Sequence, residues 1–281
     1  MIQHDFHAMG TEWAILCERC DQNILAAAQE LVRDLEARLS RFRPDSALST
    51  LNFARKVKDS ALAEVLGAAL LLRVETEGRF DPTLGARLIS LGYDRDFNAL
   101  NRPSVNTDEP FVQDLRVCIE ADEIILEGEG AIDLGGIAKG WAVDRVVDFL
   151  AAGGAENILV DGGGDIRVLG GSWPIAFGDK HSVTLRMGAI ATSSTRRRRW
   201  KSAQGQSLQH IIDPRTGLPA DTNIDTVTVI AEDAMTADAM ATAALVDLAG
   251  QLPKFLESGT QAAVRGLDGS WYTTPNWSED P

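Results

Sequence analysis

The chain has 281 residues, of which 44% are hydrophobic and 24% charged, and this balance predicts a folded protein and excludes wholesale disorder. Its formal net charge of −14 disfavours non-specific binding to nucleic acid or anionic lipid. No run approaches 18 consecutive apolar residues, and residues 1–20 lack the apolar core of a signal peptide. We therefore expect no nucleic-acid partner, no membrane span and a cytoplasmic location.

The first half of the chain alternates between strand and helix patterns. The opening residues predict a strand or hairpin, and Asp21 is placed to cap a helix over residues 22–39 with apolar side chains on one face. Residues 41–49 read as a loop containing a turn. Ser60 begins a second helix, which Gly78 ends. These helices need a partner surface, which the strands that follow can supply.

The second half is richer in strands. Its expected elements are a polar surface excursion over 97–109, a hairpin of three short runs between 117 and 134, a helix over 137–152, a strand, glycine turn and strand over 157–171, a strand-rich part over 173–230, and a last helix over 235–249. Helices and strands come in mixed clusters and not in strict alternation, which favours an α+β fold. We predict one compact domain over 1–281 with mixed, largely antiparallel sheets and flanking helices, either undivided or built from two packed lobes with the active site between them.

The three cysteines give an odd count and predict no disulfide framework. Cys17 and Cys20 form a single C-x-x-C after a strand-like run. Because there is no second pair, we expect structural thiols, with redox or zinc chemistry as the alternative.

Two glycine-rich stretches carry groups that suit anion binding. In GAIDLGGIAKGWAVDR, residues 130–145, a strand is expected to end at Asp133 and a helix to begin near Lys139, so free backbone N–H groups and an ammonium would face an anion. The alternative is a purely structural glycine turn. In VDGGGDIR, residues 160–167, three glycines allow close backbone approach or simply a tight hairpin.

Two further stretches carry metal ligands or a proton acceptor. Asp238 and Thr242 lie four residues apart on the last predicted helix, so their hard oxygen atoms share one face, as Mg²⁺ ligands or as a buried hydrogen bond. His210 precedes an Asp-Pro-Arg-Thr-Gly turn and suits a general base, or a structural hydrogen bond. The four arginines of 196–199, ten residues earlier, are the one dense basic patch.

In chain order, these motifs resemble those of the ApbE family of flavin transferases, over roughly residues 6–250. The elements that carry the resemblance are MGT (9–11), LSRFRPDSALSTLN (39–52), FDPTLG (80–85), IDLGGIAKGWAVD (132–144), GGGDIR (162–167), ATS (191–193), HIIDPRTGLP (210–219) and TADAMATAA (236–244). The resemblance implies a flavin transferase fold and an enzyme that moves FMN from FAD onto a threonine of a protein acceptor.

The resemblance also assigns roles to residues. It implies that Met9, Phe42, Phe80 and Asp81 line the flavin site, that Asp133 and Lys139 contact FAD, that the Gly136 carbonyl, Asp238 and Thr242 bind Mg²⁺, and that His210 acts in catalysis. Thr192 and Ser193 are placed with the cofactor-binding positions. Whether these two and the arginine run touch phosphate, acceptor or solvent stays open.

The implied reaction is the Mg²⁺-dependent transfer of FMN from FAD to an acceptor threonine, with release of AMP. Hydrolysis of FAD to FMN and AMP is one alternative, and a non-catalytic FAD-binding protein is another. Two departures from the family pattern favour the non-catalytic alternative: Ser194 replaces a glycine, and Ala241 stands where some members offer a carboxylate. Phe42 stands where tyrosine is common and keeps a ring to stack on the flavin. Neither the acceptor nor the oligomeric state follows from the sequence.

Overall fold

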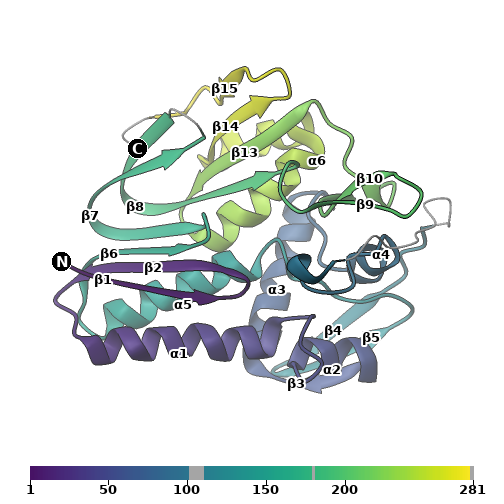
Figure 1. Cartoon of the computed structure of the whole chain (residues 1–281), viewed down its shortest axis with the longest axis horizontal. Coiled ribbons are helices and arrows are strands. Elements are labelled where there is room, and N and C mark those ends of the chain that lie inside the picture. Colours follow the sequence, from purple (N-terminus) through teal and green to yellow (C-terminus); the bar gives the residue numbers. More distant parts are fainter. Residues whose placement is uncertain (101–110, 179–180, 279–281) are drawn as a thin grey trace.

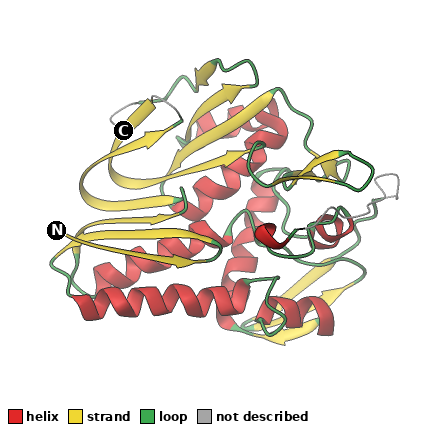
Figure 2. Ribbon diagram, in the orientation of Figure 1, coloured by secondary structure: helices red, strands yellow, loops and turns green. Residues whose placement is uncertain are grey.

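The computed structural model describes residues 1–100, 111–178 and 181–278, and its main element is an eight-stranded sheet (Figures 1 and 2). Every strand pairing in this sheet is antiparallel. In spatial order its strands are β1 (Ile2–Ala8), β2 (Thr11–Glu18), β6 (Glu156–Gly162), β7 (Ile166–Phe177), β8 (His181–Ser194), β13 (Ile224–Ala231), β14 (Gln261–Gly266) and β15 (Trp271–Thr273). The predicted α+β fold with largely antiparallel sheets is confirmed.

Six α-helices accompany the sheet in the described part of the chain: α1 (Gln22–Leu39), α2 (Ala47–Ala54), α3 (Ser60–Glu75), α4 (Gly85–Ser90), α5 (Ala138–Ala152) and α6 (Ala234–Ser258). A 3-10 turn covers Phe97–Ala99, and the rest of the surface excursion expected over 97–109 lies largely outside the described residues. Helix α5 packs on β6 and β7, and α6 packs on β8 and β13. Helices α5 and α6 therefore cover neighbouring parts of the main sheet.

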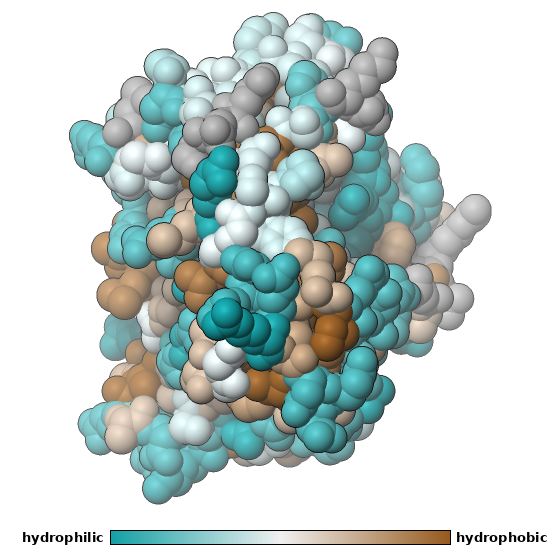
Figure 3. Space-filling view, turned by 90° about the vertical axis from the view of Figure 1, so that its left-hand side faces the viewer, coloured by the Kyte–Doolittle hydropathy of each residue, from teal (hydrophilic) through white to brown (hydrophobic). Residues whose placement is uncertain are grey.

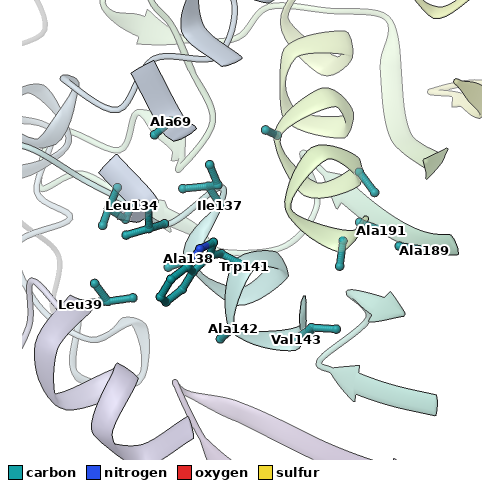
Figure 4. Close-up of a cluster of buried hydrophobic side chains, with 14 of the residues drawn as sticks. Leu39, Ala69, Leu134, Ile137, Ala138, Trp141, Ala142, Val143, Ala189 and Ala191 are labelled. Carbon is teal, nitrogen blue, oxygen red and sulfur yellow. The ribbon is translucent and has the colours of Figure 1, made fainter. Parts of the chain in front are cut away.

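Helix α1 forms where its cap and apolar spacing predict it. The Asp21 carboxylate accepts the backbone N–H groups of Asn23 and Ile24, both at 2.9 Å, and so satisfies donors that the first turn leaves free. Its apolar face is buried in the main core, which also takes in α3, α5, α6 and the inner face of the sheet (Figure 4). In that core Trp141 of α5 lies near Leu134, Ile137 and Ala138. The division of the chain into one domain or two lobes stays a prediction.

The strands outside the main sheet differ in part from the expected hairpin. Strands β4 (Arg116–Glu120) and β5 (Glu123–Glu127) pair as predicted, but their third partner is β3 (Lys56–Lys58), not residues 130–134. Ala131 instead makes one isolated bridge with Leu84. Two small ribbons complete the fold: β9 (Arg199–Lys201) pairs with β10 (Ser207–Gln209), and β11 (Ile212–Asp213) pairs with β12 (Leu218–Pro219).

Two helices differ from the sequence reading. The loop expected over 41–49 ends earlier, because the Ser46 hydroxyl accepts the Ser49 N–H at 2.9 Å and caps α2. Helix α6 continues past the expected end at 249 to Ser258, but with a kink. At Asp247 the backbone leaves the helical region (φ −157°, ψ 79°), and its carboxylate accepts the Gly250 N–H, which restarts the helix.

The expectation of free thiols at Cys17 and Cys20 is wrong: the two form a disulfide. Strand β2 ends at Glu18, and Arg19 takes a left-handed conformation (φ 52°) that turns the chain back. The Cα atoms of the two cysteines thereby lie 6.4 Å apart, within the range that a disulfide spans. Cys118 is free and exposed.

Helices α5 and α6 cross in close contact, and this contact fixes the geometry of the site described below. A Cβ atom added at Gly140 of α5 would lie 2.3 Å from the carbonyl oxygen of Ala234, the first residue of α6. Four residues later, the Asp144 carboxylate accepts the N–H groups of Ala234 and Met235, each at 2.9 Å. Burial raises the pKa of Asp144 to about 6. One helix therefore caps the other.

Candidate active site

Two adjoining cavities, of about 250 and 370 Å³, open where the main sheet, α5, α6 and the β9–β10 ribbon meet. Their linings share six residues, Phe42, Tyr93, Asp133, Gly135, Lys139 and Arg198, so the cavities form one two-part cleft. Met9 lines the second cavity, and every other residue proposed for the site from the sequence lines the first. The structure thus brings these residues together, while the role of each stays a prediction.

A buried charge cluster forms the floor of the first cavity. The Lys139 ammonium of α5 pairs with the Asp165 carboxylate and lies 3.7 Å from Oδ2 of Asp238 on α6. Burial by itself would lower the pKa of Lys139, but the two carboxylates outweigh it and the pKa is raised. Burial and the charge of Asp165 raise the pKa of Asp238 to about 7. Two carboxylates therefore share one ammonium, and Oδ2 of Asp238 has no hydrogen-bond partner.

Thr242 lies one helical turn beyond Asp238 and faces the same cavity. Its hydroxyl is 3.1 Å from the Ser193 hydroxyl of β8. A Cβ at Gly136 would stand 3.4 Å from the Thr242 Oγ1 and 3.3 Å from the Phe80 ring, so only a glycine lets the backbone approach this closely without displacing them. Thr192, the preceding residue of β8, also lines this cavity, and its hydroxyl shares a hydrogen bond of 3.0 Å with that of Thr228.

These groups fit a divalent cation. The cluster of Lys139, Asp165 and Asp238 lacks one positive charge when both carboxylates are ionised, and Oδ2 of Asp238 has no hydrogen-bond partner. Thr242 lines the same cavity one helical turn further along α6. A carboxylate, a hydroxyl and a backbone carbonyl are hard oxygen ligands of the kind that Mg²⁺ accepts. Within residues 1–100, 111–178 and 181–278 no three His, Cys, Asp or Glu side chains gather as a metal site. A cation here would therefore rely on few protein ligands.

His210 lies between β10 and β11 and lines the first cavity. Burial, and next the positive charge of Arg198, lower its pKa to about 3, so the imidazole is neutral at physiological pH. Its Nδ1 is buried and has no hydrogen-bond partner. The following turn is held by the Asp213 carboxylate, which accepts the backbone N–H of Arg215 at 2.9 Å. A neutral ring with a free nitrogen is suited to accepting a proton from a bound hydroxyl group.

An aromatic and cationic wall separates the two cavities. The guanidinium carbon of Arg41 lies 4.3 Å from the centre of the Phe42 ring and 4.7 Å from that of Tyr93, within cation–π range. Its Nε atom donates to the Asp133 carboxylate, whose other oxygen accepts the Gly135 N–H at 2.8 Å. Asp133, expected to contact FAD, is thus already paired with Arg41.

The remaining predicted flavin-site residues, Phe80, Asp81 and Met9, differ in burial and in hydrogen bonding. Asp81 is buried, and its carboxylate accepts hydrogen bonds from Arg73, Gln113 and Thr83 at 2.7–2.8 Å. This saturation favours a structural role for the carboxylate over direct contact with a ligand. Phe80 is buried against the core, whereas Met9 sits at a left-handed turn (φ 51°) beside the second cavity.

The cleft also contains residues that the sequence analysis did not assign to the site, among them Arg41, Tyr93, Asp165 and Arg198. Asp165 stood in the GGGDIR stretch, and Arg198 in the arginine run. No local pattern could assign either side chain to the cleft. The turn before Asp165 is built as that stretch predicts, since Gly163 has φ 76° and any side chain there would collide with Thr11. Arg198 has φ 49° although it is not a glycine.

The departures noted in the sequence have local explanations. The Ser194 hydroxyl donates to the Asp225 carbonyl at 3.0 Å, so the turn that usually carries glycine is tied to β13. Ala241 is fully buried in the core and lines neither cavity.

No helix in the described part of the chain is long and apolar enough to cross a bilayer. The face at the left of Figure 1 presents mostly polar side chains with scattered apolar ones between them (Figure 3). Single apolar side chains scattered among polar ones are ordinary on a protein surface.

Comparison with known proteins identifies the family. The model of the ApbE family matches residues 9–265. A Treponema pallidum protein named FAD:protein FMN transferase is 33% identical over 270 residues, covering 83% of this chain and 74% of that protein. A Vibrio cholerae protein of the same name is 33% identical over 242 residues, covering 77% and 71%.

Solved structures agree with the sequence comparisons. The ApbE protein of Thermotoga maritima superposes with a TM-score of 0.85 at 26% identity and covers 98% of this chain and 97% of its own. The flavin transferase ApbE of Vibrio cholerae superposes with a TM-score of 0.78 at 28% identity, with the same coverage. The chain therefore belongs to the ApbE family and is a transferase.

Proposed function

We propose that this enzyme transfers FMN from FAD to a threonine hydroxyl of an acceptor protein in a Mg²⁺-dependent reaction that releases AMP. The observation that carries the proposal is the arrangement of the two-part cleft. One cavity holds a proton acceptor and an incomplete cation site, and it adjoins a second cavity across an aromatic wall. A two-part ligand such as FAD suits this shape, because its flavin and adenosine halves flank a diphosphate.

Asp238, Thr242 and the Gly136 carbonyl are the groups that would hold Mg²⁺. Bound there, the ion would neutralise the negative charge of the diphosphate during transfer. Lys139 contributes a second positive charge to the same cavity and, through Asp165, is fixed in position. Ser193 holds the Thr242 hydroxyl by a hydrogen bond and so limits its rotation.

His210 is the proposed base. The threonine hydroxyl of the acceptor would lose its proton to the imidazole as its oxygen forms a bond to the FMN phosphorus. The bond between that phosphorus and the bridging oxygen breaks, and AMP leaves with the bridging oxygen. Since the imidazole is neutral in the free enzyme, its nitrogen is available for this proton.

Incubation with FAD, Mg²⁺ and a candidate acceptor protein tests the proposal. We expect flavin fluorescence on the acceptor after denaturing electrophoresis and one AMP released for each label. His210→Ala should abolish labelling and still bind FAD; retained turnover would remove His210 from the mechanism. Free FMN without labelled protein would support the hydrolase alternative, and FAD that stays bound and intact in the presence of Mg²⁺ would support the non-catalytic one.

The cytoplasmic location stays a prediction, and the Cys17–Cys20 disulfide weighs against it. Disulfides persist in oxidising compartments and are rare in the cytosol. Alkylation of the protein in intact cells, followed by mass spectrometry, would report whether these two thiols are free. Protection of both from alkylation would favour an oxidising compartment.

A further inference from the structure

Arg198 differs from the other arginines of its run. Arg196 forms an ion pair of 2.8 Å with Asp225, and Arg199 donates to the Ser207 hydroxyl at 3.3 Å. Arg198 lines both cavities, and its side chain forms no hydrogen bond or ion pair with any other described residue. Its left-handed backbone (φ 49°) is unusual for a residue with a side chain. A strained residue that aims an unpaired cation into a cleft calls for a functional explanation.

Carboxylates share the cleft with Arg198, but Asp133 pairs with Arg41, and Asp165 and Asp238 share Lys139. The charge of Arg198 lowers the pKa of His210 and acts in the same direction on Tyr93 and Lys139. A positive group placed among such neighbours gains little from them. An anion bound in the cleft would supply the missing partner.

Arg41 offers an independent second donor in the second cavity. Its side chain is 6% exposed, its Nε donates to Asp133, and its guanidinium lies against Phe42 and Tyr93. The remaining Nη2 atom is buried without any acceptor. A buried donor left unpaired costs free energy, so such an atom in a cavity indicates an acceptor supplied by a ligand.

We propose that Arg198 and the Nη2 atom of Arg41 bind the diphosphate of the dinucleotide substrate where the two cavities meet. Both residues border the second cavity, and Arg198 borders the first as well. A guanidinium matches the spacing of two phosphate oxygens and keeps its charge at any physiological pH. The identity of the ligand rests on the proposed function, whereas the anion site rests on these two side chains.

Binding of FAD and of riboflavin, which lacks phosphate, to the full chain in EDTA tests the inference. For wild type, FAD should bind more tightly than riboflavin. Arg198→Gln should weaken FAD binding about 10- to 100-fold, the loss expected for a charge-assisted hydrogen bond, and leave riboflavin binding unchanged. Arg199→Gln makes the same change in net charge outside the cleft and should leave both affinities unaltered. Arg41→Lys keeps the charge opposite Asp133 but removes Nη2, so a smaller loss for FAD is expected.

Several results would overturn the inference. The first is that the wild type binds FAD and riboflavin with equal affinity. The second is that Arg198→Gln binds FAD as tightly as wild type does. The third is that Arg198→Gln and Arg199→Gln lose the same amount of FAD affinity. Should Arg198→Gln fail to fold, Arg198→Lys provides the same comparison with the charge kept, and an FAD affinity equal to that of wild type would then refute bidentate binding. Absence of transfer to any acceptor would count against the proposed function alone, because these measurements require no turnover.

Discussion

Gly140→Ala would test whether the contact between α5 and α6 sets the geometry of the site. The new Cβ would stand 2.3 Å from the Ala234 carbonyl oxygen and 2.7 Å from its carbon, whereas real Cβ atoms essentially never come within 3.0 Å of another atom. The two helices would have to separate by at least about 0.7 Å at this point, and both obstructing atoms belong to the backbone. A flexible side chain cannot absorb this change.

The expected cost follows from two opposing effects. Overpacking of a tight contact typically costs about 1–3 kcal/mol, while replacing a glycine inside a helix by alanine gains about 0.5–1 kcal/mol. The variant should therefore be less stable than wild type by up to about 2.5 kcal/mol, with a central expectation of about 1 kcal/mol. Because Lys139 is adjacent in α5 and Asp238 lies in α6, the same displacement would widen the charge cluster, and a shift approaching 1 Å can lower a rate by about 10²-fold.

Gly67→Ala provides the matched control. Gly67 also lies inside a helix, α3, but the nearest atom to its added Cβ is Cδ1 of Ile119 at 4.0 Å. This substitution should stabilise the protein by about 0.5–1 kcal/mol and leave transfer unchanged. Urea unfolding and the rate of FMN transfer in the presence of Mg²⁺, measured on both variants, check the two expectations. A Gly140→Ala protein as stable and as active as wild type would refute the close contact.

Three further predictions concern charge. Arg198→Gln removes a positive charge that lowers the pKa of His210, so the acid limb of kcat/KM for FAD should move to higher pH; an unchanged limb would count against their proximity. Burial raises the pKa of Asp144 from 3.8 to about 6, so the folded state binds more protons than the unfolded state between these values, and the free energy of unfolding should fall as pH rises from about 4 to 6. Asp144→Asn should remove that slope in urea titrations. Asp238→Ala should sharply raise the Mg²⁺ concentration needed for half-maximal transfer, and an unchanged requirement would exclude it as a ligand.

The long helices were predictable because their signals are local. The helix over 22–39 follows from the cap at Asp21 and the spacing of apolar residues. The last helix also forms where the sequence predicts it, and the structure differs only near its end, where α6 kinks at Asp247 and continues to Ser258. The pairing of β3 with β5 was not predictable, because it joins Lys56 to Ile125, and strand partners so far apart are selected by the assembled core. The disulfide was missed because the left-handed turn at Arg19 has no mark in the sequence.

The candidate site was predictable only in part, and through motif order more than through local chemistry. His210 and Asp238 stand in stretches that the family resemblance identifies, and the structure brings them to one cavity. Tyr93 and Arg41 reach the cleft through tertiary packing that no nearby motif encodes. Asp165 is buried beside Lys139, and a carboxylate at the end of a glycine turn would ordinarily be expected in solvent.

The charges of the cleft predict that FAD and Mg²⁺ bind with positive coupling. Six cationic and six carboxylate side chains line its two cavities: Arg41, Arg43, Arg79, Lys139, Arg197, Arg198, Glu36, Asp81, Asp96, Asp133, Asp165 and Asp238. When the carboxylates are ionised these charges cancel, and His210 is neutral. A diphosphate adds about two negative charges, which a protein of net charge −14 cannot balance from its surface, whereas one divalent cation restores neutrality. The dissociation constant of FAD should therefore be lower in Mg²⁺ than in EDTA, and this difference should shrink in Asp238→Ala. Equal dissociation constants would mean that the cleft accepts the diphosphate on its own side chains, Arg198 foremost among them.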